Sequence, residues 1–225
     1  MSTFFNSSIG KKLLMSLAGL FLCTFLLVHL GINLMLLRHD GGELFRIAVG
    51  FMTTNVLIKV MEMVLFAGFF IHIVWAIILQ IQNWIARPSK YAVINYSQSS
   101  FFSKYMIHTG TVILVFLCLH FINFYFVKLG ICSAPQGTNK VESPHDFYNM
   151  AINLFSQPVY CYTYIIFMCI LSFHLLHSFQ SAFQTLGINH NKYTPVIKVI
   201  GIIYSIAVPA GFAIIPLYFL LFRGK

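Results

Sequence analysis

The sequence predicts an all-α membrane protein in which five transmembrane helices form a bundle. Of its 225 residues, 59% are hydrophobic and only 8% are charged, whereas a soluble globular domain has about 25% charged residues. The apolar residues fall into runs that are long enough to cross a hydrocarbon core of about 30 Å. We therefore expect a single integral membrane domain over residues 1–225.

Polar segments separate the five expected spans, which cover approximately residues 13–37, 56–84, 105–127, 158–183 and 196–222. The first run has about 25 residues, which is too long for the apolar region of a signal peptide. A polar loop is expected over residues 38–55. The connection over residues 128–157 is rich in Gly, Pro, Asn and charge, so we expect a surface excursion there, with room for a short interfacial helix.

The net charge of +9 does not indicate a nucleic-acid partner, because the cations stand singly at the ends of apolar runs. Cations at such positions face lipid headgroups and water. With the N-terminus inside, seven Lys and Arg residues fall inside and seven fall outside, so their distribution gives a tie. All five acidic residues then fall outside, and we expect a cytoplasmic N-terminus.

Each of the first four spans carries a histidine deep within its apolar run. His29 and His120 lie 16 and 15 residues into the first and third spans, which run in the same direction. At about 1.5 Å per residue, both reach a level about 22–24 Å from the inner face. His72 and His174 each lie 16 residues into spans that run the other way. They therefore share a second level, roughly 15–20 Å from the first.

Two histidine pairs at two depths predict two bis-histidine sites stacked across the membrane. One intramembrane histidine is often a hydrogen-bonded packing residue, but four at matched depths favour metal ligands. A dinuclear carboxylate iron site needs several acidic residues, and a zinc site needs four ligands together. Axial ligation of haem iron by two imidazoles needs one histidine from each of two facing helices. We therefore expect the bundle to enclose two b-type haems.

Two glycines lie at the depth where a porphyrin would need space. Gly19 and Gly110 each precede the histidine of their span by ten residues. This spacing places them about 15 Å away, at the level of His72 and His174. Glycine there would let a porphyrin approach the backbone closely.

The chain resembles the dihaem cytochrome b membrane anchor of succinate:quinone oxidoreductases over essentially its whole length. The resemblance rests on four strings in order: VHLGIN with His29, FIHIVWAI with His72, CLHFINFYF with His120 and FHLLHSFQSAFQTLG with His174. It implies that His72 and His174 ligate the haem proximal to the soluble subunits, and that His29 and His120 ligate the distal haem. Ser178 replaces a glycine of the family pattern, so His177 remains the alternative ligand, or supports the ligand from one turn away.

The resemblance also implies partners and a role. The partners would be a flavoprotein subunit with covalent FAD and an iron–sulfur subunit of a succinate dehydrogenase or fumarate reductase, in a bacterial cytoplasmic membrane. The chain itself would hold no succinate site. It would pass electrons between the iron–sulfur subunit and a quinone, and the two-haem arrangement resembles the menaquinone-linked members.

Four further residues are candidates around these sites. Glu62 precedes His72 by ten residues, at about the level of the distal haem, where it would exchange protons with a quinone or pair with Lys59 three residues earlier. Three other candidates for contact with haem propionates are Arg38, Arg46 and His108. An ordinary interfacial role is the alternative for His108.

Two other functions remain open on the sequence. One is a dihaem cytochrome b of another membrane dehydrogenase, such as a hydrogenase or formate dehydrogenase, which also places histidines in its spans. The absence of histidine from the fifth span favours the succinate:quinone family. The other is a transporter that uses histidines as a proton relay, for which we expect an internal repeat that the sequence does not show clearly.

Overall fold

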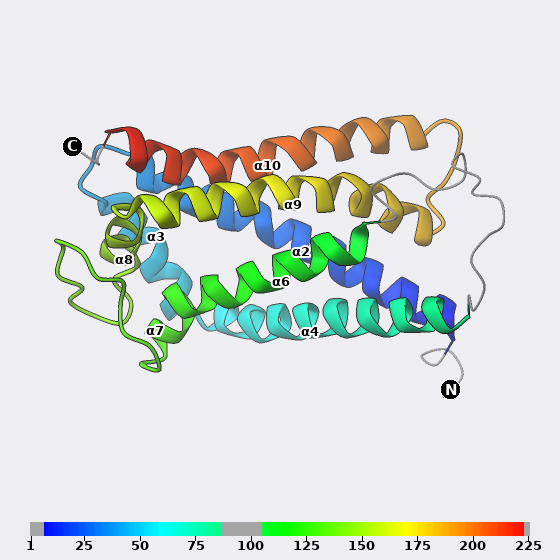
Figure 1. Ribbon diagram of the computed structural model, residues 1–225, viewed down its shortest axis with the longest axis horizontal. Coiled ribbons are helices and arrows are strands. Elements are labelled where there is room, and N and C mark those ends of the chain that lie inside the picture. Colours follow the sequence, from blue (N-terminus) through cyan, green and yellow to red (C-terminus); the bar gives the residue numbers. More distant parts are fainter. Residues whose placement is uncertain (1–6, 87–104, 223–225) are drawn as a thin grey trace.

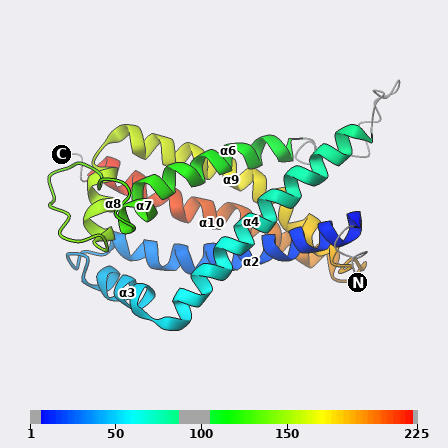
Figure 2. The ribbon, with the colours of Figure 1, turned by 90° about the horizontal axis from the view of Figure 1, so that it is seen from below.

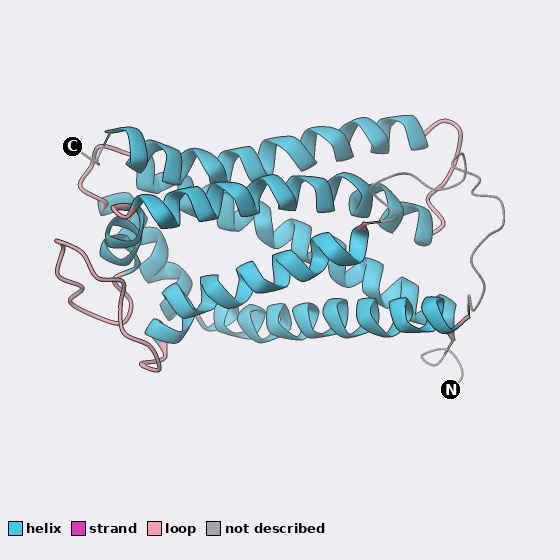
Figure 3. Cartoon of the chain, viewed as in Figure 1, coloured by secondary structure: helices cyan, strands magenta, loops and turns pink. Residues whose placement is uncertain are grey.

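The computed structural model describes residues 7–86 and 105–222, and the elements in these two ranges are helical (Figure 3). In chain order they are α2 (Ser8–Leu34), the 3-10 turn η1 (Met35–Leu37), α3 (Glu43–Thr54), α4 (Val56–Ile85), α6 (Met106–His120), the π-helical segment η2 (Phe121–Tyr125), α7 (Phe126–Lys128), α8 (Phe147–Phe155), α9 (Pro158–Thr185) and α10 (Thr194–Phe222). Five of these stretches are long and apolar enough to cross a membrane, as predicted. The chain is therefore compatible with a multi-pass membrane protein.

The five long stretches run along one axis of the molecule (Figure 1). α9 packs against α10, and α2 contacts α4, α9 and α10, whereas α4 and α6 touch at few points. Figure 2 shows α4 crossing α2 obliquely. We call the end that carries α3, α8 and residues 129–146 the loop end. α2 begins at the opposite end, and α10 finishes at the loop end (Figure 1).

Local capping sets where the first two spans begin. The Ser7 side chain accepts a hydrogen bond from the Gly10 N–H at 3.0 Å, so α2 starts five residues before the predicted boundary at Leu13. The Asn55 side chain accepts from the N–H groups of Leu57 and Ile58 at 2.9 and 3.3 Å, and α4 begins directly after it. Both caps satisfy amide groups that the first turn of a helix leaves free.

The loop predicted over residues 38–55 is wrong, because most of it is the helix α3. Gly42 precedes α3 with a φ of +85°, a left-handed conformation that glycine adopts without strain. Apolar residues predominate in α3, and Phe45 is buried. The long connection contains a second helix, α8, which is mostly buried against the bundle instead of lying free at the surface.

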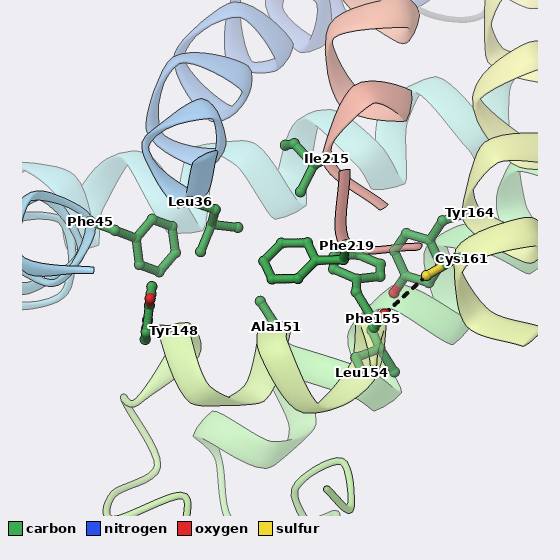
Figure 4. Close-up of a cluster of buried hydrophobic side chains, with 10 residues drawn as sticks. All are labelled: Leu36, Phe45, Tyr148, Ala151, Leu154, Phe155, Cys161, Tyr164, Ile215 and Phe219. Atoms are coloured by element: carbon green, nitrogen blue, oxygen red, sulfur yellow. Dashed lines mark hydrogen bonds between the residues drawn. The ribbon is translucent and has the colours of Figure 1, made fainter. Parts of the chain in front are cut away.

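The loop end holds a packed apolar core (Figure 4). Phe155 of α8 meets the Tyr164 ring of α9 edge to face at 5.2 Å, and Phe219 of α10 lies 6.0 Å from Phe155. The Cys161 thiol donates to the Phe155 carbonyl at 3.1 Å. α8 thus joins α9 to α10, and this contact fixes Tyr164 beside the histidines described next.

Candidate functional site

His29 and His120 face each other near the loop end. Their ring centres are 5.8 Å apart and their planes are almost perpendicular, at 89°. His29 comes from α2, and His120 is the last residue of α6. We call them the α2–α6 pair. Five aromatic rings lie within 5.1–6.3 Å of the two imidazoles: Phe25, Phe116, Phe124, Tyr164 and Phe212.

His72 and His174 form a second pair, whose ring centres are 6.5 Å apart at an angle of 76°. They come from α4 and α9, and we call them the α4–α9 pair. Both predicted glycines lie against these rings. A Cβ on Gly19 would be 3.3 Å from the His72 ring, and a Cβ on Gly110 would be 3.6 Å from the His174 ring. The space that the glycines leave is therefore used by the imidazoles themselves.

The two pairs lie at two levels of the bundle. Gly19 touches His72, and His29 follows ten residues later on the same helix. Gly110 touches His174, and His120 follows ten residues later on α6. At 1.5 Å per residue each helix gives a separation of about 15 Å. Two helices thus agree on the spacing that the sequence predicts.

The spacing within each pair suits two ligands of one metal ion. With metal–nitrogen bonds of about 2.0 Å, imidazoles on opposite sides of a metal have ring centres about 6 Å apart. The observed 5.8 and 6.5 Å lie on either side of this value. All four histidines are only partly buried. In the described ranges no three His, Cys, Asp or Glu side chains group as metal ligands, so these donors occur as pairs. The residues present therefore fit axial ligation of haem better than an all-protein metal centre.

The Nδ1 atoms of the two pairs have different surroundings. In the α4–α9 pair, His72 Nδ1 lies 3.3 Å from the Met15 carbonyl oxygen, and His174 Nδ1 lies 3.1 Å from Thr109 Oγ1. In the α2–α6 pair, His29 Nδ1 lies 3.4 Å from the amide nitrogen of Asn33. His120 Nδ1 is buried without a hydrogen-bond partner among the described residues.

A π-helical segment directly follows His120, and sequence reasoning missed it. Such segments are rare and often occur at functional sites. Within it, Asn123 is buried and its amide donates to the Tyr164 hydroxyl at 3.0 Å. This bond joins the segment to α9 beside the His120 ring. The string FINFY carries no periodicity that distinguishes a π-helix from an α-helix, so no sequence signal was available.

Of the two neighbouring histidines on α9, His174 is the one whose ring faces His72. His177 lies one turn further and is partly buried. The structure thus brings together the residues expected for the proximal pair and leaves His177 beside them. His108 is exposed, with its ring 5.8 Å from Tyr105, near the start of α6.

Glu62 forms an ion pair, but its partner is not the predicted Lys59. The Lys128 ammonium donates to both carboxylate oxygens at 2.9 and 3.0 Å. The same ammonium lies 5.1 Å from the centre of the Tyr125 ring. Both charged side chains keep some solvent exposure, 29% for Glu62 and 20% for Lys128. This cluster ties α4 to α7 at the loop end.

Both arginines make their contacts within the loop end. Arg38 lies 3.4 Å from Asp40, while Arg46 donates to the Gly41 carbonyl at 2.9 Å and lies over the Tyr148 ring at 4.3 Å. Desolvation opposes ionisation of Asp40, but hydrogen bonds from two backbone N–H groups and the charge of Arg38 lower its pKa below the ordinary value. Among the described residues, none of these contacts joins an arginine to a histidine pair.

Two hollows also lie at the loop end. One of about 630 Å³ is lined by α3 and by residues 142–149, and one of about 330 Å³ is lined by η2 and residues 133–136. Three polar side chains of the larger hollow contact one another. Asp146 accepts from the Asn149 amide at 2.7 Å and lies 4.0 Å from Arg46.

No known family model, curated protein or solved structure matches this chain. The likeness to the dihaem anchors therefore rests on the four histidine strings and stays a proposal.

Proposed function

We propose that the chain is a dihaem cytochrome b that anchors a succinate dehydrogenase or fumarate reductase in the membrane. It would pass electrons between the iron–sulfur subunit of that complex and a membrane quinone. One observation carries the proposal: four histidines from four helices form two facing pairs, about 15 Å apart along the bundle.

The two imidazoles of each pair would hold one haem b. When bound, haem supplies a one-electron iron couple, and the protein tunes it through the ligands and their surroundings. The chain's own part is to orient the imidazoles and to limit the access of water. Gly19 and Gly110 help to orient the imidazoles of the α4–α9 pair. The aromatic rings around the α2–α6 pair limit the access of water. Two centres at two depths suit electron transfer across most of a bilayer.

The absence of histidine from the fifth span and the string around His174 favour a succinate:quinone complex over other dehydrogenases. On this proposal the chain lies in a bacterial cytoplasmic membrane with its N-terminus in the cytoplasm. The flavoprotein subunit with its FAD and the iron–sulfur subunit would dock at the end where α2 begins. The α4–α9 pair would then be proximal to them, and the α2–α6 pair distal.

Glu62 is the candidate for proton exchange with the quinone, which we take to be menaquinone. It lies ten residues before His72 on α4, toward the loop end and the level of the α2–α6 pair. Its ion pair with Lys128 supports a structural role as well, so activity and stability must be measured separately.

The test is purification of the tagged chain from its native membrane. We expect flavin, iron–sulfur clusters and b haem in one complex. Succinate should reduce the haem iron, as followed by the absorbance of the haem. Haem reduced by hydrogen or formate, but not by succinate, would assign the chain to another dehydrogenase. A chain without haem would contradict the electron-transfer function.

A further inference from the structure

We infer that Thr109 is a positioning residue that sets the tautomer of His174 and lowers the reduction potential of the haem at the α4–α9 pair. This inference rests on the proposed function. Thr109 lies in the first turn of α6, and its Oγ1 is 3.1 Å from Nδ1 of His174 on α9. The same oxygen lies 2.9 Å from the Met106 carbonyl, to which the hydroxyl donates.

The single hydroxyl hydrogen fixes the direction of both contacts. If Thr109 donates to the Met106 carbonyl, its lone pairs remain free to accept the Nδ1–H of His174. If it donated to His174 instead, the contact with Met106 would be lost. Only the first arrangement makes both hydrogen bonds. It places the proton on Nδ1 and leaves the lone pair on Nε2 for a metal.

The Nδ1 atom of His72 also faces a hydrogen-bond acceptor, in this case a backbone carbonyl. Its Nδ1 lies 3.3 Å from the carbonyl oxygen of Met15, which can only accept a hydrogen bond. Gly19, one turn after Met15, leaves the space through which the ring reaches this carbonyl. Gly110 stands next to Thr109 and leaves the same space for His174. Both imidazoles of the α4–α9 pair are therefore held with Nε2 available as a ligand atom.

An acceptor on Nδ1–H makes an imidazole a stronger electron donor to the metal. A stronger donor stabilises the oxidised iron, so it lowers the reduction potential of the haem. His120 of the α2–α6 pair has no partner for its Nδ1 among the described residues. Because the histidine that Thr109 contacts is His174, Thr109 acts on the haem of the α4–α9 pair.

The experiment is a spectroelectrochemical titration of the complete complex carrying Thr109→Val. Valine keeps the shape and removes the acceptor. We expect two haems per chain, one with an unchanged midpoint and one with a higher midpoint. Loss of such a partner typically changes metal affinity or activity by about tenfold or more. A tenfold change in the ratio of oxidised to reduced haem equals about 59 mV for one electron.

Two control variants separate this effect from general damage to α6. Thr109→Ser keeps the acceptor and should restore the wild-type midpoint. Thr111→Val removes an exposed hydroxyl whose bond within the described ranges is to the Ile107 carbonyl of its own helix, at 2.9 Å, and it should change neither haem. The haem that shifts in Thr109→Val should be the one that is lost in His174→Ala.

Each outcome decides the inference. Two haems with unchanged midpoints in Thr109→Val would overturn the role of Thr109 and leave the proposed function standing. Loss of one haem in Thr109→Val that Thr109→Ser restores would support it, whereas loss in both variants would overturn it. A wild-type chain that binds no haem would overturn the proposed function and this inference with it.

Discussion

The α2–α6 pair and the α4–α9 pair present the same two imidazoles at similar spacing, in different surroundings. The α2–α6 pair is enclosed by aromatic rings, adjoins the packed core of the loop end and leaves His120 Nδ1 without a partner among the described residues. The α4–α9 pair is seated against two glycines, and an oxygen lies close to each Nδ1. Packing thus dominates around the α2–α6 pair, where only His29 has an Nδ1 contact, to the Asn33 amide. Hydrogen-bond acceptors lie at both Nδ1 atoms of the α4–α9 pair. Changes to either kind of contact should affect one level and spare the other.

The largest expected effect is the loss of a whole site. His72→Ala and His120→Ala should each reduce the haem content from two per chain to one, because each removes one axial ligand from a different pair. The pyridine haemochrome assay measures the content. The double variant should bind none, and exposed His108→Ala should keep both. If His120→Ala also emptied the other site, the two levels would not be independent.

The second effect concerns the glycines that lie against the His72 and His174 rings. Gly19→Val should remove the haem of the α4–α9 pair and keep the other, since even a Cβ would be 3.3 Å from the His72 ring and valine is larger. Gly31→Val on the same helix is the matched control, because a Cβ there meets nothing within 4 Å. Reduced-minus-oxidised spectra resolve the two haems. Equal haem loss in both variants would show a general helix defect instead of a specific seat.

The third effect concerns the packed level. Tyr164→Phe removes the acceptor of the buried Asn123 amide, at a cost of about 1 kcal/mol in stability. The haem of the α2–α6 pair should be lost at a lower temperature than in the wild type, while the other haem should be retained as before. The absorbance of the haems during heating measures the loss of each haem. Earlier loss of the α4–α9 haem alone would contradict the assignment of Tyr164 to this level.

The smallest effect on haem is expected at the Glu62–Lys128 ion pair. The pair is partly exposed, so Glu62→Gln should cost no more than about 1 kcal/mol and leave both haems in place. The rate of quinone turnover in Glu62→Gln, compared with the rate in Lys128→Met, separates proton exchange by Glu62 from a structural ion pair. A large loss in Glu62→Gln alone indicates proton exchange by Glu62. Equal small losses in both variants indicate a structural ion pair.

The sequence predicted the two levels because helices have a fixed rise. Counting residues from each apolar boundary placed His29 with His120 and His72 with His174, and errors of a few residues at the boundaries did not change the pairing. The glycines were found by the same count. The five spans were predicted because the spacing between polar segments matches the thickness of a bilayer.

The features that the sequence did not predict depend on contacts between distant residues. The ion pair considered for Glu62 was with Lys59 at helical spacing, as the alternative to proton exchange, but its partner, Lys128, is 66 positions away. The sequence analysis did not single out Thr109, and its contact with His174 spans 65 positions. α3 was missed because its polar residues resemble a loop, and the packing of its buried Phe45 against Tyr148 of α8 joins residues far apart in the sequence. Such contacts become visible only in three dimensions.

The haem content of the purified wild-type chain tests the central claim most directly. The claim is that the two histidine pairs are two bis-histidine haem sites. We expect two b-type haems per chain in the pyridine haemochrome assay. Folded protein made with adequate haem supply that contains no haem would contradict the claim, and a value of one would show that a single pair is a ligand set.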